Sequence, residues 1–152
     1  MRSGDNRAKE TVMRVVVLVH PGNPAGYENG EMPESSLLEK MMKFNTELVD
    51  AGVMLAGEGF HPSSKGARVQ FDRSGNASVS EGPFADLTNL VGGFWLWKVN
   101  SFDEALAWAR RAPMEPGATL EIRRVFESEE FGEEIAAQEN ELRKKIDHEP
   151  GA

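Results

Sequence analysis

The sequence contains no cysteine, and this absence removes several classes of function at once. Without a thiol in its 152 residues, the chain cannot form disulfides, thiolate metal sites or iron–sulfur clusters, nor use a cysteine nucleophile. The longest apolar run, residues 15–19, is far shorter than the roughly 20 residues of a membrane-spanning helix. The first eleven residues are polar and lack the apolar core of a secretory signal. We therefore expect a cytoplasmic protein that does not enter a membrane.

Positive charge is also scarce. The chain has 17 Lys and Arg against 25 Asp and Glu, which gives a net charge of −8. Because nucleic-acid binding needs a basic face, we expect no nucleic-acid partner. Residues 127–152 alone hold nine acidic and three basic side chains. Composition thus predicts a disordered lead over 1–12, a domain over 13–126, and an acidic C-terminal helix and tail over 127–152.

The hydrophobic pattern predicts an alternation of strands and helices. Strands are expected where β-branched and aromatic residues alternate between turn signals, at 13–20, 53–56, 67–71, 76–80, 92–99 and 119–126. Helices are expected where apolar residues recur at helical spacing, at 36–51, 101–112 and 128–146, with a loop at 21–33. Ser36 with Glu39, and Ser101 with Glu104, fit capping boxes, and Ser128 is expected to cap the last helix.

This order of elements predicts the fold class and an oligomeric state. A β-α-β unit, a hairpin and a second β-α-β unit are typical of an α+β, ferredoxin-like sheet with both helices on one face. The strands at 13–20 and 92–99 are nonetheless apolar on both faces. An open apolar sheet face is an interface signal, and a second copy of the chain can bury it. We therefore expect a homodimer.

Four segments resemble the YCII-related proteins, also called DGPF-domain proteins. The family segment Asp-Gly-Pro-Phe-Ala-Glu corresponds to Glu-Gly-Pro-Phe-Ala-Asp at 81–86, and similar stretches follow in the same order as in the family at 51–63, 90–94 and 101–113. The resemblance implies a dimeric α+β barrel in which two ferredoxin-like sheets close face to face. Some members lie beside or are fused to extracytoplasmic-function sigma factors, which implies a sensing or regulatory role.

The wider group to which the resemblance points includes proteins with a proposed His-Asp catalytic pair. Their histidine lies on the first helix, where this chain has Phe44 and Asn45. No histidine lies between His20 and His61. The resemblance therefore does not carry that catalytic pair over to this chain.

His20 and Glu58 are the candidate catalytic residues. His20 ends the first strand and Glu58 lies between two glycines at the end of the second, so either could act as a general base beside a pocket. Each also has a structural interpretation. His20 could be satisfied by loop backbone, and Glu58 could be a solvated carboxylate.

Six further residues could contact a ligand. Glu81 and Asp86 could be an acid/base pair, or parts of a turn in which Glu81 accepts backbone N–H bonds and Phe84 fills the core. Trp95 could line a pocket or belong to the core and interface, and the arginines could hold an anion or form salt bridges. The candidate ligand-binding residues are His61, Arg68, Glu81, Asp86, Trp95 and Arg123. We expect no metal and no cofactor.

Three functions stay open at this point. The first is a dimer that binds a small molecule, as a sensor or accessory protein. The second is an enzyme of the isomerase, lyase or oxygenase type that uses His20 or Glu58 as acid or base. The third is a protein-interaction module that acts through the tail helix, whose narrow apolar stripe would lie on the body or on a partner subunit: Phe131, Ile135, Gln138, Leu142 and Ile146.

Overall fold

The computed structural model describes residues 12–148. Most of the lead predicted at 1–12, and the last four residues of the tail, lie outside the described part. The strands are β1 Met13–His20, β2 Met54–Gly59, β3 Ala67–Phe71, β4 Ala77–Glu81, β5 Gly93–Val99 and β6 Thr119–Arg124. The helices are α2 Pro24–Glu28, α3 Ser35–Asp50, α4 Phe102–Arg111 and α5 Glu133–His148, with short 3-10 helices η1 Ser63–Lys65 and η2 Ser128–Phe131.

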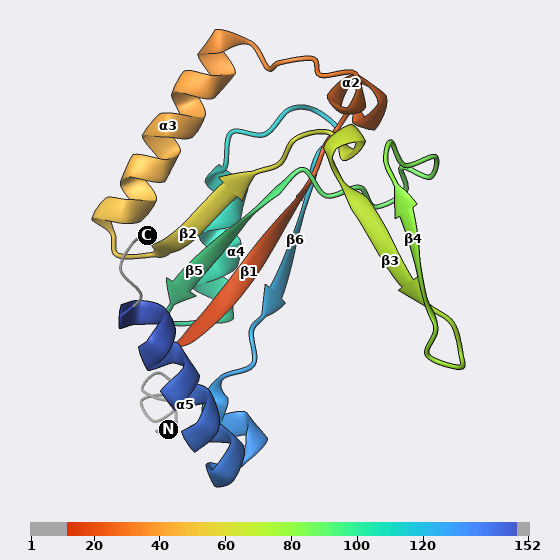
Figure 1. Cartoon of the computed structure of the whole chain (residues 1–152). Coiled ribbons are helices and arrows are strands. Elements are labelled where there is room, and N and C mark those ends of the chain that lie inside the picture. Colours follow the sequence, from red (N-terminus) through yellow and green to blue (C-terminus); the bar gives the residue numbers. More distant parts are fainter. Residues whose placement is uncertain (1–11, 149–152) are drawn as a thin grey trace.

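The main sheet has four strands in the order β2-β5-β1-β6, and every neighbouring pair is antiparallel. The helices α3 and α4 lie on the same side of this sheet (Figure 1). The strands β3 and β4 form a separate two-stranded hairpin that projects away from the sheet (Figure 1). The predicted α+β, ferredoxin-like fold is therefore confirmed.

The core lies between the sheet and the two helices. Alternate residues of β1 and β5 point to this side, and Val15, Val17 and Trp97 are fully buried there. From α3, Leu48 is fully buried and Phe44 almost so. Edge-on aromatic contacts then join the layers, since the Phe44 ring packs 5.8 Å from Trp95, 6.5 Å from Trp97 and 6.1 Å from Trp108.

The opposite side of the sheet, called the open face below, carries the other set of alternating residues. Its centre consists of four partly exposed apolar side chains, Val16, Leu18, Phe94 and Leu96. Since their neighbours along the strands, such as Val17 and Trp95, pack in the core with α3, strand alternation places these four on the side away from the helices. The apolar character predicted for both faces of these strands is thus present in the structure.

Two local predictions near the start of the chain are wrong. The expected loop at 21–33 contains helix α2, because the Asn23 side chain accepts a hydrogen bond from the Gly26 N–H at 3.1 Å and Pro24 occupies the first helical position. Helix α3 begins at Ser35 after Glu34. Ser36 therefore already has helical backbone and cannot cap. The predicted helix end is confirmed, since Gly52 follows the helix with φ +74°.

The tail prediction is wrong in two respects. Residues 128–146 do not form one helix, because Gly132 adopts φ +94° and separates η2 from α5. The Glu127 and Glu130 side chains form the capping box at the start of η2, so Ser128 is not the cap. The predicted apolar stripe is exposed in the single chain, with Phe131 45%, Ile135 47%, Leu142 58% and Ile146 69% exposed. It therefore does not pack on the body.

Leu48 provides a test of this packing. Leu48→Ala removes a fully buried side chain from the contact between α3 and the sheet, and we expect the free energy of unfolding to fall by about 2–5 kcal/mol. Urea denaturation followed by circular dichroism measures the change. Met42→Ala, on the same helix but 66% exposed, should change stability by less than about 0.5 kcal/mol. Equal losses in both variants would contradict the assigned helix face.

Candidate functional site

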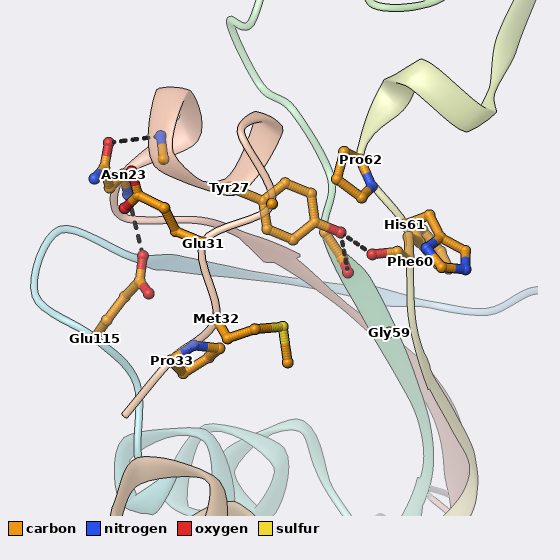
Figure 2. A pocket seen from close by; sticks show the side chains of 13 residues that line it. Asn23, Tyr27, Glu31, Met32, Pro33, Gly59, Phe60, His61, Pro62 and Glu115 are labelled. Carbon is orange, nitrogen blue, oxygen red and sulfur yellow. Dashed lines mark hydrogen bonds between the residues drawn. The ribbon is translucent and has the colours of Figure 1, made fainter. Parts of the chain in front are cut away.

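The loops at one end of the main sheet enclose a pocket of about 600 Å³. Its walls come from α2, from the segment that joins α2 to α3, from the end of β2, and from Glu115 in the loop before β6 (Figure 2). These segments are far apart in the sequence. The sheet brings them together because β1, β2 and β5 are neighbours.

Tyr27 fixes α2 to the sheet at this pocket. Its hydroxyl lies against the carbonyl oxygens of Phe60 and Gly92, 3.1 Å from the latter, and donates its proton to this pair (Figure 2). Burial, and then the negative charge of neighbouring Glu28, raise the pKa of the Tyr27 hydroxyl. Tyr27 is therefore protonated at neutral pH and acts as a hydrogen-bond donor between α2, β2 and β5.

Glu28 and Ser63 form a second junction beside Tyr27. The Glu28 carboxylate accepts hydrogen bonds from the Ser63 hydroxyl and, at 2.9 Å, from the Ser63 N–H. The Ser63 hydroxyl oxygen in turn accepts from the Phe84 N–H at 2.8 Å. Ser63 is only 7% exposed. One buried serine therefore joins α2, η1 and the Glu-Gly-Pro-Phe segment at 81–84.

Only glycine fits at position 82 of that segment, for a steric reason. A Cβ at this position would lie 1.7 Å from the Ser63 carbonyl oxygen, which is backbone and cannot rotate away. The peptide bond between Gly82 and Pro83 is cis. Next in the segment, Phe84 is partly buried and the Arg68 guanidinium lies 3.8 Å from its ring centroid. These contacts make residues 82–84 a docked turn.

The remaining members of the segment face solvent. Glu81 is exposed at the end of β4, opposite Ala67. The Asp86 carboxylate accepts a hydrogen bond from the Thr88 N–H at 2.9 Å. That bond and, to a smaller extent, the positive charge of Arg68 lower the pKa of Asp86. Glu81 and Asp86 thus lie in different surroundings.

His20 is held at the end of β1 by two acceptors. Its Nδ1 is 2.9 Å from the Leu90 carbonyl oxygen and its Nε2 is 3.2 Å from a Glu121 carboxylate oxygen. The Arg123 guanidinium donates to the other oxygen of Glu121 at 3.2 Å. The hydrogen bond from His20, followed by that from Arg123, lowers the pKa of the Glu121 carboxyl.

Another pocket, of about 370 Å³, is lined by Glu58 and Trp95 together with Met41 and Asn45 of α3. Glu58 is exposed, whereas Trp95 is buried and donates its indole N–H to the Asn45 side-chain oxygen at 2.9 Å. Trp95 therefore belongs to the core as well as to this pocket.

The structure brings some of the predicted site residues together and separates others. His20 and Arg123 share Glu121, and Arg68 acts on Asp86. His20 and Glu58 line different pockets. Among the eight predicted residues, His61 is the one that lines the 600 Å³ pocket. The sequence does not point to the other polar groups around the two adjoining pockets, which are Asn23, Tyr27, Glu28, Glu31, Ser63, Lys65 and Glu115. Only the Asn-Pro helix start at 23–24 could have pointed to α2.

Two structural features are absent from residues 12–148. Within that range, no group of three or more His, Asp or Glu side chains is arranged to hold a metal ion. No helix in the same range has the length and apolar content needed to cross a membrane.

The model of the YCII-related domain matches residues 13–129, more than half of the chain. The chain belongs to the YCII-related family. A search of curated proteins finds no match. The YCII-related domain ends within η2, so α5 lies beyond the matched region of this family member.

Gly82 tests the docked turn. Gly82→Ala would place a Cβ against the Ser63 carbonyl, and the resulting displacement should lower the free energy of unfolding by about 1–3 kcal/mol. Thermal unfolding followed by circular dichroism measures it. Gly66→Ala is the control, since its Cβ would lie 3.6 Å from the nearest backbone atom, the Ser63 carbonyl oxygen, and its φ of −133° suits alanine. Equal effects of the two changes would argue against docking at Ser63.

The lowered pKa of Glu121 predicts that the stability of the fold depends on pH in the acid range. Its folded-state pKa lies below the ordinary value of 4.5, so the charged form stabilises the fold above pH 4.5. This contribution disappears as the pH falls from 4.5 through the folded-state pKa. Glu121→Gln should therefore show a shallower loss of stability in this acid range than the unmodified protein. Urea midpoints measured from pH 3 to pH 6 test this, with exposed Glu39→Gln as control. Parallel curves would contradict the role of Glu121.

Proposed function

We propose that this YCII-related protein binds a small organic molecule in the 600 Å³ pocket beside Tyr27 and His61, as a sensor or accessory protein. The pocket is the observation that carries the proposal. Its volume lies in the range of ligand sites, and it combines apolar walls with a few polar groups. The hydrogen bonds of Tyr27 and Glu28 hold its walls in place before a ligand arrives.

His61 is the polar group best placed to contact the ligand. It is exposed at the pocket rim, between Phe60 and Pro62 (Figure 2). Within residues 12–148, the structure shows no hydrogen bond to its ring, so either nitrogen can serve a ligand as donor or acceptor. The same three residues also line a neighbouring pocket of about 440 Å³. His61 thus lies between two parts of one hollow surface.

The contacts of His20 favour binding over acid–base catalysis by that residue. A general base needs a free lone pair within reach of the substrate. Both ring nitrogens of His20 are directed at acceptors, the Leu90 carbonyl and the Glu121 carboxylate. Glu58 is exposed and lines a different pocket. The two alternative bases of the enzyme hypothesis therefore line different pockets, and neither lines the 600 Å³ pocket.

A ligand screen tests the proposal. Compounds from a metabolite library should shift the amide ¹H–¹⁵N resonances of Tyr27 and residues 59–61 of the unmodified protein. His61→Ala should weaken the tightest of these ligands by about tenfold, since it removes a direct polar contact. Arg73→Ala, in the hairpin turn, should leave the affinity unchanged. Shifts confined to other surfaces, or equal affinity in the unmodified protein and in His61→Ala, would contradict the proposed site.

We further propose that the open face binds a second copy of the same chain. Its apolar centre, Val16, Leu18, Phe94 and Leu96, is only partly covered in the single chain. An apolar sheet face of this kind is a common interface between identical subunits, which a two-fold axis makes self-complementary.

The charges at the two ends of the open face support a second copy as its partner. At one end Lys98 lies directly opposite Arg14, an unfavourable pair of like charges. Glu127 neutralises only Arg14, through contacts of 3.0 Å. At the other end Glu58 is paired in register with Phe94. A two-fold axis that runs across the strands would place Lys98 of each copy near Glu58 of the other.

A charge exchange tests this dimer. Lys98→Glu and Glu58→Lys should each weaken dimerisation by about tenfold, because each places like charges in contact across the interface. The double variant should restore it, because the pair is reversed. Analytical ultracentrifugation over a concentration series measures the dissociation constant, and Lys40→Glu on the outer side of α3 is the control. A monomeric unmodified protein, or a double variant as weak as the singles, would contradict the proposal.

A further inference from the structure

We infer that the ligand of the 600 Å³ pocket is a cationic amine with a flat apolar body. This inference rests on the proposed function and adds the chemical class of the ligand. It follows from the charges, the aromatic wall and the shape of the pocket.

The charged groups of the pocket select against anions. Glu31 and Glu115 line it, and none of its 13 described lining residues is lysine or arginine. A carboxylate or phosphate ligand would therefore meet two like charges without a fixed counter-charge. An ammonium group can instead donate charge-assisted hydrogen bonds to these carboxylates. His61, the one other ionisable lining group besides Tyr27, lies on the opposite side (Figure 2).

The local structure holds the Glu115 carboxylate in position and leaves room for that of Glu31. One oxygen of Glu115 accepts hydrogen bonds from the Gly22 N–H at 2.7 Å and the Asn23 N–H at 3.1 Å. The second Glu115 oxygen takes no hydrogen bond from residues 12–148 of the structure. A Cβ on Gly26 would lie 2.7 Å from a Glu31 carboxylate oxygen. Because Gly26 has no side chain, the Glu31 carboxylate can lie against α2.

The opposite side of the pocket is apolar apart from His61. Figure 2 shows the Tyr27 ring between Glu31 on one side and Phe60, His61 and Pro62 on the other, with Met32 below the ring. A flat ligand body can stack on such rings, and an ammonium group near an aromatic face gains a further electrostatic attraction. Met32 is 79% exposed, and its unbranched side chain can adapt to the ligand surface.

The pocket also has room for a longer ligand body. It shares Pro33, Gly59 and Gly92 with the 370 Å³ pocket beside α3, so the two hollows adjoin. The second hollow is lined by three methionines, Met41, Met54 and Met114. A ligand can therefore place its ammonium group at the carboxylates and extend its apolar part toward these methionines.

Three probes with one ring system test the ligand class. Tryptamine, indole and indole-3-acetate share the indole body and carry a positive, zero and negative charge. Titrations followed by ¹H–¹⁵N spectra of the full chain at pH 7 should show tryptamine binding at Tyr27 and Asn23. Its affinity should be at least tenfold higher than that of indole-3-acetate, and added salt should reduce the difference.

Glu31→Gln connects this preference to the carboxylate. It should weaken tryptamine binding at least threefold and leave indole binding unchanged. Glu34→Gln, a nearby exposed glutamate that does not line the pocket, is the matched control and should alter neither.

The outcomes separate this inference from the proposed function. If tryptamine fails to bind, or binds no more tightly than indole-3-acetate, the inference about ligand class is overturned. If the metabolite screen still finds a neutral or anionic ligand at residues 59–62, the proposed function stands. If the screen also finds nothing there, the proposed function fails as well. Equal loss of tryptamine binding in Glu31→Gln and Glu34→Gln would overturn the role of Glu31.

Discussion

The junction at Ser63 is the constraint on which the candidate site depends. Its hydroxyl and amide bind the Glu28 carboxylate, and its hydroxyl oxygen holds the Phe84 amide. Because these hydrogen bonds satisfy the partly buried Glu28 carboxylate, α2, η1 and the turn at 82–84 are held together as one unit. Tyr27, the neighbour of Glu28, then reaches the ends of β2 and β5. The pocket walls are therefore fixed by polar contacts between loops, whereas the sheet and helices are fixed by apolar packing.

This division explains how far the sequence alone could predict the structure. Periodicity located every strand of the main sheet, because buried alternation such as that of β1 is a local pattern. It also located α3, α4 and the hairpin. It did not reveal α2, a helix of five residues that is too short for any periodicity and depends on the Asn23 cap. The break at Gly132 was missed for a similar reason, since a single glycine leaves the helical pattern on either side intact.

The candidate site was harder to predict than the fold. The sequence predicts His61 as a ligand-binding candidate, and His61 lines the pocket. No sequence pattern points to Ser63 or Glu115. Their importance comes from contacts across 35 residues to Glu28 and across 93 residues to Gly22, which no spacing rule can detect. For His20, the strand end was visible in the sequence. The two acceptors that engage its ring, Leu90 and Glu121, became visible only in three dimensions.

The hairpin of β3 and β4 is attached to the body beside the candidate site. All ten of its strand residues are exposed, and it leaves the body between Gly66 and Gly82, whose backbones are hydrogen-bonded to each other. Both of these glycines lie against Ser63. The base of the hairpin thus lies directly beside Ser63, the residue that holds α2. A displacement of the hairpin base would therefore change the contacts of Ser63 with Glu28 and Phe84.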